Sequence, residues 1–173
     1  PSVYNGLYTM HGTVMLFLFL FPILNGFNNL LIPTMIGAPD MAFPKLNAAA
    51  FWLVPLFAVV LMGSFFAPGG PASSGWWSYP PMSLQNPLNH FINGQFLWIL
   101  AVALSGISSI MGAVNFVTTI IRMRAPGMGF FKMPIFVWTA WAAQTIQLVG
   151  LPALTGGAAV SYTHLTLPTS SVV

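Results

Sequence analysis

Four long runs of apolar residues, separated by short polar or Gly/Pro-rich segments, make up most of the chain. They cover residues 8–36, 46–66, 91–121 and 133–157. A helix needs about 20 such residues to cross the hydrocarbon core of a bilayer. Apolar residues occur all round each predicted helix, which is typical of helices embedded in lipid. The pattern predicts an all-α, polytopic transmembrane helix bundle.

Small and turn-forming residues refine these helices. Pro22 lies inside the first run, where a proline can kink a helix, and the segment 68–71 (PGGP) ends the second run. The third run carries small residues at close spacing, which predicts tight packing against a neighbouring helix. They are Ser105, Gly106, Ser109, Gly112 and Ala113.

The composition excludes several classes of protein. Only four of the 173 residues are Lys or Arg and one is Asp or Glu, so 3% are charged, against about 25% in soluble domains. A water-soluble globular fold is thereby excluded. The absence of cysteine excludes disulfide scaffolds, thiolate metal sites and iron–sulfur clusters. Four basic residues form no patch that could track phosphates, so we expect membrane lipid and no nucleic acid as a partner.

The basic residues also predict the orientation of the chain. Lys45 lies between the first two runs, and Arg122, Arg124 and Lys132 lie between the last two. Two crossings separate these loops, so they share one side of the membrane. The positive-inside rule makes that side cytoplasmic, or the matrix in a mitochondrion. The loop with Trp76 and Trp77 then lies on the outer side.

The last residues differ from the rest of the chain. Residues 161–173 (SYTHLTLPTSSVV) are rich in Ser and Thr and interrupt the apolar pattern. We interpret them as foreign read-through appended to a natural segment of residues 1–160, and assign no function to His164. The alternative is a genuine polar loop.

His11 is the one ionisable residue of the first run. A histidine inside a membrane is costly and is a candidate for function, since neutral imidazole can ligate haem iron or another metal. Gly12 beside it leaves room for a large planar ligand. The alternative is a histidine that bonds to a neighbouring helix.

Asp40, the sole acid, lies in the predicted cytoplasmic loop with polar residues on the flanking helices. An acid at the mouth of an amide- and hydroxyl-lined path could collect protons and pass them inward. Two alternatives stay open: Asp40 caps a helix or pairs with Lys45, and the polar side chains only join helices. Those side chains are Asn29, Asn47, Ser108, Ser109 and Asn115.

Five motifs together resemble subunit I of the haem-copper terminal oxidases, in order and with natural spacing between residues 4 and 152. They are YTMHGTVM (8–15), MIGAPDMAFPKLN (35–47), GWWSYPPMS (75–83), GISSIMGAVNF (106–116) and MRAPGM (123–128). The resemblance implies that the four runs are the second to fifth helices of a twelve-helix subunit. The acid with its Asn and Ser residues is similar to the A-type branch.

The resemblance also implies roles for single residues. His11 matches an axial ligand of the low-spin haem, and Asp40 matches the inlet carboxylate of the D-type proton channel. Trp76 matches a tryptophan beside the propionates of the high-spin haem, with Tyr79 close by. The amides and hydroxyls named with Asp40 match the channel lining. The copper ligands, the high-spin haem ligand and the second low-spin ligand belong to later helices.

The implied parent is a cytochrome c oxidase that reduces oxygen to water and pumps protons in the respiratory chain. It would hold two haems and copper, with a copper-bearing subunit II and a subunit III as partners, in the bacterial plasma membrane in preference to the mitochondrial inner membrane. We expect this chain alone to be inactive. Val3 and Gly6 lack the polar groups of quinol oxidases, which favours cytochrome c as donor, with quinol as the alternative. A non-catalytic multi-span protein and a small electron-transfer haem protein are the other hypotheses.

Overall fold

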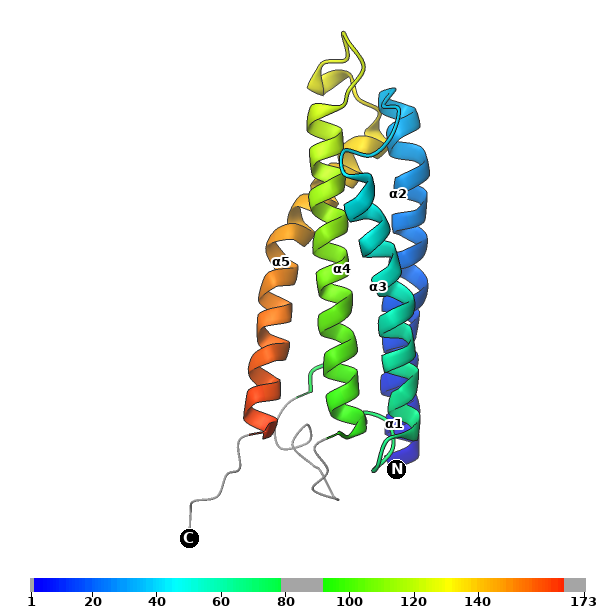
Figure 1. Ribbon diagram of the computed structural model, residues 1–173, viewed down its shortest axis with the longest axis vertical. Coiled ribbons are helices and arrows are strands. Elements are labelled where there is room, and N and C mark those ends of the chain that lie inside the picture. The colour runs from blue at the N-terminus through cyan, green and yellow to red at the C-terminus, as the bar shows by residue number, and fades with distance from the viewer. Residues whose placement is uncertain (1, 79–91, 167–173) are drawn as a thin grey trace.

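The computed structural model describes residues 2–78 and 92–166. These residues form an elongated bundle of helices that run side by side (Figure 1), and in the described ranges the sole strand-like pairing is an isolated bridge between Pro71 and Gly94. The predicted all-α transmembrane bundle is confirmed. Its longer elements are α1 (Ser2–Thr13), α2 (Phe21–Ile36), α3 (Pro44–Gly63), α4 (Gly94–Arg122) and α5 (Ile135–Thr166).

The first column of the bundle is continuous from α1 to α2. A π-helical stretch, η1 (Val14–Leu20), joins the two, and Phe21 N–H bonds to the carbonyl of Leu16. Pro22 follows directly and has no N–H to donate, so it cannot contribute the usual bond to the preceding turn. A π-helical insertion is often found at functional positions in helices. Here it lies between the turn that carries His11 and the turns that carry the asparagines.

The helix ends follow from local chemistry. Gly37 ends α2 in the left-handed region (φ 72°), which glycine adopts without steric cost. Pro44 is the first residue of α3, where its missing N–H is not needed. Asn93 precedes α4, and its side chain accepts a hydrogen bond from Phe96 N–H at 2.8 Å. A short 3-10 turn, η2 (Ser64–Phe66), extends α3.

Three of the described helical columns are long and apolar enough to cross a membrane: Val3–Ile36, Pro44–Phe66 and Gly94–Arg122. The first begins before residue 8, where the apolar run starts. Helix α5 has 32 residues but is not among the three, so a fourth crossing over 133–157 stays a prediction. Helix α5 also continues through the junction at residue 160 to Thr166. The foreign origin of residues 161–173 likewise stays a prediction.

Helix α4 is the centre of the bundle. In its most apolar stretch 44% of the residues are buried, against 22% for the α3 column and 11% for the first column. Gly106 allows α5 to approach closely, because a Cβ there would overlap the hydroxyl of Thr155. Two apolar clusters line this centre. One contains Met10, Phe17, Phe57, Leu61 and Trp98, and the other contains Ile32, Ile36, Phe116, Ile120 and Val137.

Candidate functional site

A cavity of about 170 Å³ lies between α2, α3 and α4. Its walls are largely apolar, with aromatic rings such as Phe17, Phe51 and Phe116. A cavity of this volume has room for several water molecules, provided that polar groups line it. It has such groups from three helices: Asn25, Asn29, Asn47, Ser105, Ser108 and Ser109. The structure therefore brings four of the predicted path residues, Asn29, Asn47, Ser108 and Ser109, around one space.

The two asparagines at this cavity contact each other. Asn47 Nδ2 donates a hydrogen bond to Asn29 Oδ1 at 2.8 Å. Asn29 Nδ2 in turn donates to the backbone carbonyl of Asn25 at 2.9 Å. Both ends of the Asn29 amide are thus engaged, which fixes its orientation toward α3. The pair joins α2 to α3 and supplies polar groups that can also bond to water.

Ser108 joins the other side of the cavity. Its hydroxyl is buried and donates to the backbone carbonyl of Ala50 on α3 at 2.7 Å. Its oxygen retains acceptor capacity after this bond, since a hydroxyl carries two lone pairs. Ser109 lines the cavity beside it. Helices α3 and α4 therefore contribute hydroxyl and amide groups to one polar surface.

Asp40 lies outside this cavity, in the exposed loop between α2 and α3. Its Oδ1 accepts a hydrogen bond from Met41 N–H at 2.7 Å. It does not cap α3, because Phe43 occupies the N-cap position and no side chain caps that helix end. Asp40 forms no ion pair with Lys45, although the structure describes both residues and both are exposed. Asp40 is therefore exposed at the end of the bundle where Arg124 lies, since Ala125 N–H donates a hydrogen bond to the carbonyl of Ile36, the last residue of α2, at 2.9 Å.

Asn115 connects the loop of Asp40 to α4 and does not line the cavity. It is fully buried, and its Oδ1 accepts a hydrogen bond from Phe43 N–H at 2.9 Å. Its Nδ2 is also buried and has no partner within residues 2–78 and 92–166. The Phe43 carbonyl accepts a hydrogen bond from Asn47 N–H at 3.0 Å. The backbone of Phe43 thus links Asn115 to the first turn of α3.

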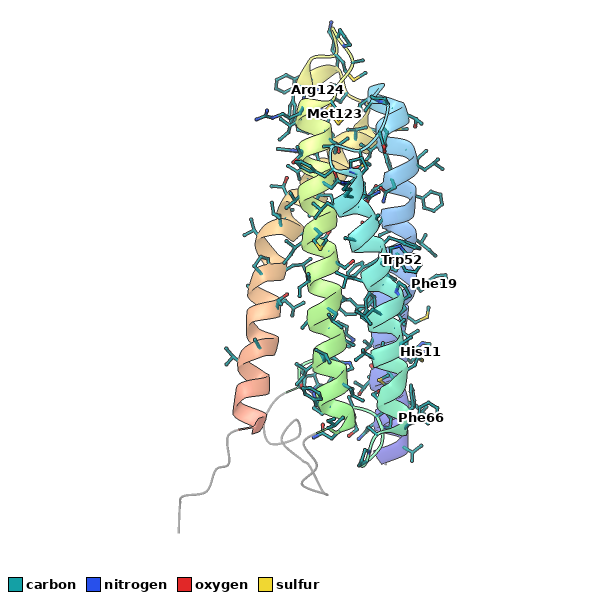
Figure 2. All side chains as sticks on the ribbon, in the orientation of Figure 1. His11, Phe19, Trp52, Phe66, Met123 and Arg124 are labelled. Atoms are coloured by element: carbon teal, nitrogen blue, oxygen red, sulfur yellow. The ribbon has the colours of Figure 1, made fainter. Side chains whose placement is uncertain are left out.

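His11 lies on α1, far along the bundle from Arg124, and its side chain is on the outer surface of the column (Figure 2). The residues one turn before and after it, Leu7 and Met15, are also exposed, 56% and 44%. An exposed imidazole between apolar side chains in a membrane suits an axial haem ligand, because neutral imidazole binds iron and the porphyrin is apolar. Within the described ranges no group of three or more His, Cys, Asp and Glu could hold a bare metal ion. The donor set therefore fits a haem that receives its second ligand from elsewhere.

Trp76 packs directly behind the turn of His11. Its ring stacks on Phe17, with centroids 5.1 Å apart, and meets Trp98 edge-on at 6.0 Å. A Cβ at Gly12 would lie 3.4 Å from Trp76 Nε1. That Nε1 is buried and finds no acceptor among the described residues. Glycine at position 12 therefore gives the indole close access to α1.

The loop that carries Trp76 is held by side-chain hydrogen bonds. Gly75 N–H donates to Thr9 Oγ1 at 3.1 Å. Gln95 Nε2 donates to Ser78 Oγ at 2.7 Å, and Ser74 Oγ donates to Gln95 Oε1 at 2.9 Å. These contacts fix the loop to both α1 and α4. The remaining residue predicted near this site, Tyr79, lies outside the described residues.

Some contributors were missed by reasoning from the sequence. Asn25 and Ser105 line the cavity, while Thr9, Thr13 and Thr119 hold loops or helices in place. A usable signal existed, because polar residues recur four positions apart in these apolar helices, as at 9 and 13, 25 and 29, and 115 and 119. Such pairs lie on the same face of a helix. That spacing marks a polar stripe but does not say what it contacts.

Comparison with known proteins relates the chain to one family of membrane proteins. The family model described as "Cytochrome C and Quinol oxidase polypeptide I" matches residues 1–172. Similar relatives are the "Probable cytochrome c oxidase subunit 1-beta" of Nocardia farcinica, 46% identical over 88% of this chain, and the "Cytochrome c oxidase subunit 1" of Synechocystis, 48% identical over 89%. A protein of the latter name from Thermostichus vulcanus is 46% identical over 91%. The chain spans 26%, 27% and 28% of the length of these three relatives.

Proposed function

Since this chain belongs to the cytochrome c and quinol oxidase polypeptide I family, as its motifs predict, and is an integral membrane protein, we propose that it supplies two parts of a terminal oxidase. One part is a proton inlet that begins at Asp40, and the other is an axial haem ligand, His11. The other cofactor ligands are proposed to belong to the rest of subunit I. This chain spans about a quarter of the length of the relatives that it matches.

The observation that carries the proton inlet is the polar lining of the interhelical cavity. The Asn47–Asn29 hydrogen bond of 2.8 Å and the buried Ser108 hydroxyl border the same space of about 170 Å³. Asp40 lies at the exposed end of the elements that form it, and Phe43 links its loop to Asn115. Water held by amides and hydroxyls can relay protons from a surface carboxylate. The polar lining of this cavity supports a water-filled path in preference to polar contacts that only join helices.

His11 is proposed to hold the low-spin haem by its imidazole nitrogen. Haem bound there would supply one-electron transfer within the enzyme. The exposed position of His11 leaves it accessible to a haem ligated from another helix of the subunit. Trp76, packed at Gly12 with a buried and unpartnered Nε1, is proposed to donate a hydrogen bond to a haem propionate. Tyr79 is proposed to lie near it.

The assembled enzyme is proposed to reduce oxygen to water with electrons from cytochrome c and to pump protons. The relatives are named as cytochrome c oxidases, which supports cytochrome c as the donor in preference to quinol. Copper, a second haem, subunit II and subunit III would be contributed by the rest of the complex. Bacterial relatives favour a bacterial plasma membrane as its location. The chain by itself is proposed to be inactive, since the other ligands lie on later helices.

The test is Asp40→Asn in the complete oxidase that contains this chain, reconstituted in lipid vesicles. Asn retains the shape of the side chain but cannot carry a proton, so proton uptake and turnover should fall by about 10²-fold, the lower end of what a positioned proton-transfer group contributes. The haem absorbance spectrum should stay unchanged. Lys45 is an exposed charged residue in the first turn of α3. Lys45→Gln is the matched control and should keep normal turnover. Normal turnover and pumping in Asp40→Asn would reject the inlet.

A further inference from the structure

We propose that Thr119 is a positioning residue for proton uptake, because its hydroxyl, together with the Asn115 amide, fastens the Asp40 loop to α4. The proposal rests on the proposed function of Asp40 as the inlet. Thr119 itself does not line the cavity and touches no proton-carrying group in the described residues. Its effect would act through the loop.

Two successive backbone N–H groups of this loop point at α4. Ala42 N–H donates to Thr119 Oγ1 at 2.9 Å, and Phe43 N–H donates to Asn115 Oδ1 at 2.9 Å. The two acceptors are four residues apart and therefore lie one turn apart on one face of the helix. Both side chains are fully buried. A pair of bonds of this kind restricts both the position and the tilt of the loop.

The Thr119 hydroxyl is oriented for this task. It donates its proton to the carbonyl of Asn115 at 2.7 Å, which leaves its lone pairs for the Ala42 N–H. Met41 adds an apolar contact: its side chain is 4% exposed, belongs to the cluster around Phe116 and Ile120, and its sulfur lies 4.0 Å from Thr119 Oγ1. Asp40 is exposed, whereas Met41 and Ala42, the two residues after it, are held against α4.

The rest of the loop depends on these bonds. Gly37 and Ala38 are tied to α2 through the Pro33 carbonyl. Within the described chain, the bonds from Ala42 and Phe43 are the backbone N–H hydrogen bonds that join residues 39–43 to α4, beside the weak contact of Thr119 Oγ1 with the Met41 sulfur. Without the Thr119 acceptor, the partly buried Ala42 N–H loses its partner, and the loop gains an alternative in which this N–H turns to water. Asp40 would then spend less time at the mouth of the path.

The experiment uses Thr119→Val in the complete oxidase in vesicles, since valine keeps the shape and removes the acceptor. Loss of one hydrogen bond should raise amide exchange in residues 40–43 by about tenfold. Proton uptake should slow by about three- to tenfold, because Asp40 then spends a smaller fraction of time at the mouth of the path. Electron transfer into the haem should keep its normal rate. Thr119→Ser, which retains the hydroxyl, should restore uptake.

Thr118→Val is the matched control. Thr118 is the preceding residue of α4, and its hydroxyl bonds to the Val114 carbonyl of its own helix at 2.8 Å. This variant should leave both exchange and proton uptake at the normal rate. If Thr119→Val lowers the yield of assembled enzyme, Thr119→Ala removes the same acceptor with less bulk and takes the same measurements.

Asp40→Asn, measured in parallel, separates the positioning role of Thr119 from the inlet role of Asp40. Slow uptake in Asp40→Asn with normal uptake in the Thr119 variants would overturn the positioning role and leave the inlet in place. Normal uptake in Asp40→Asn would overturn both. Slowed electron transfer in Thr119→Val, or failure of Thr119→Ser to restore uptake, would reveal a general structural role and also overturn the proposal.

Discussion

Asn47 on α3 donates a hydrogen bond to Asn29 on α2, with 2.8 Å between Nδ2 and Oδ1, beside the cavity that the two helices share with α4. An amide inside an apolar bundle is costly unless it is hydrogen-bonded. The pair satisfies part of that need and leaves the second Asn47 proton and further lone pairs for water. The contact therefore serves both packing and the proposed proton path.

Asn29→Leu should slow proton uptake in the complete oxidase. Leucine removes the acceptor for Asn47 and narrows the polar lining of the cavity, so we expect a fall of about tenfold, which is below the 10²-fold effect of losing a proton-carrying group. Proton uptake during turnover is the measurement, with the haem spectrum as the check on assembly.

Asn28→Leu is the control for that variant. Asn28 is the preceding residue and does not line the cavity, so its replacement should leave proton uptake unchanged. Equal rates in the two leucine variants would contradict a specific role of the Asn29 amide.

His11→Ala should abolish the absorbance of the low-spin haem in the complete enzyme, because alanine offers no nitrogen to the iron. The control is Met15→Ala, one turn along the same exposed surface, which should keep the band. The measurement is the reduced-minus-oxidised absorbance spectrum. A normal low-spin band in His11→Ala would exclude this histidine as the axial ligand.

The fold could be predicted from the sequence because hydropathy over long windows decides which segments enter lipid. Its boundaries could not. The first column begins at Ser2 and includes the buried, polar Thr9, whose hydroxyl donates to the Asn5 carbonyl at 2.7 Å and accepts a hydrogen bond from Gly75 N–H at 3.1 Å. A hydropathy pattern counts Thr9 as polar and cannot know that its hydroxyl is satisfied.

The sequence predicts which polar residues belong to the site but not what each of them contacts. The cost of polar groups in lipid singles out Asn29, Asn47 and Asn115 alike. Tertiary packing then divides them, since Asn29 and Asn47 meet at the cavity while Asn115 binds the backbone of Phe43. Which of these roles an asparagine takes depends on the path of a loop about 70 residues away in sequence, and no local pattern encodes that.

Thr13→Val should destabilise the chain by about 1–3 kcal/mol, the cost of leaving a buried donor without a partner. The buried Thr13 hydroxyl accepts a hydrogen bond from Trp98 Nε1 at 2.9 Å and thereby joins α1 to α4. The measurement is unfolding of the complete oxidase by denaturing detergent.

Two further variants are the controls for Thr13→Val. Thr34→Val changes an exposed threonine whose hydroxyl bonds only to carbonyls of its own helix, and it should shift the unfolding free energy by less than about 0.5 kcal/mol. Thr13→Ser should recover most of the loss. A stable Thr13→Val protein would show that the indole N–H finds another acceptor.

Gly94→Ala should destabilise the end of the bundle where α4 begins, whereas Gly63→Ala should not. A Cβ at Gly94 would overlap the carbonyl oxygen of Gly70 at the bridge between Pro71 and the start of α4. Backbone cannot move aside as a side chain can, so we expect a loss of about 1–3 kcal/mol. A Cβ at Gly63, the last residue of α3, meets no atom within 4 Å beyond its chain neighbours and the backbone of its own helix. Alanine there should stabilise by about 0.4–1 kcal/mol through the unfolded chain. Unfolding by denaturing detergent measures both variants.

The loop after Gly70 also carries Trp76, so Gly94→Ala should in addition change the haem spectrum if that loop borders the haem. Equal stability of the two variants would mean that the segment 68–75 can withdraw from α4 at no cost.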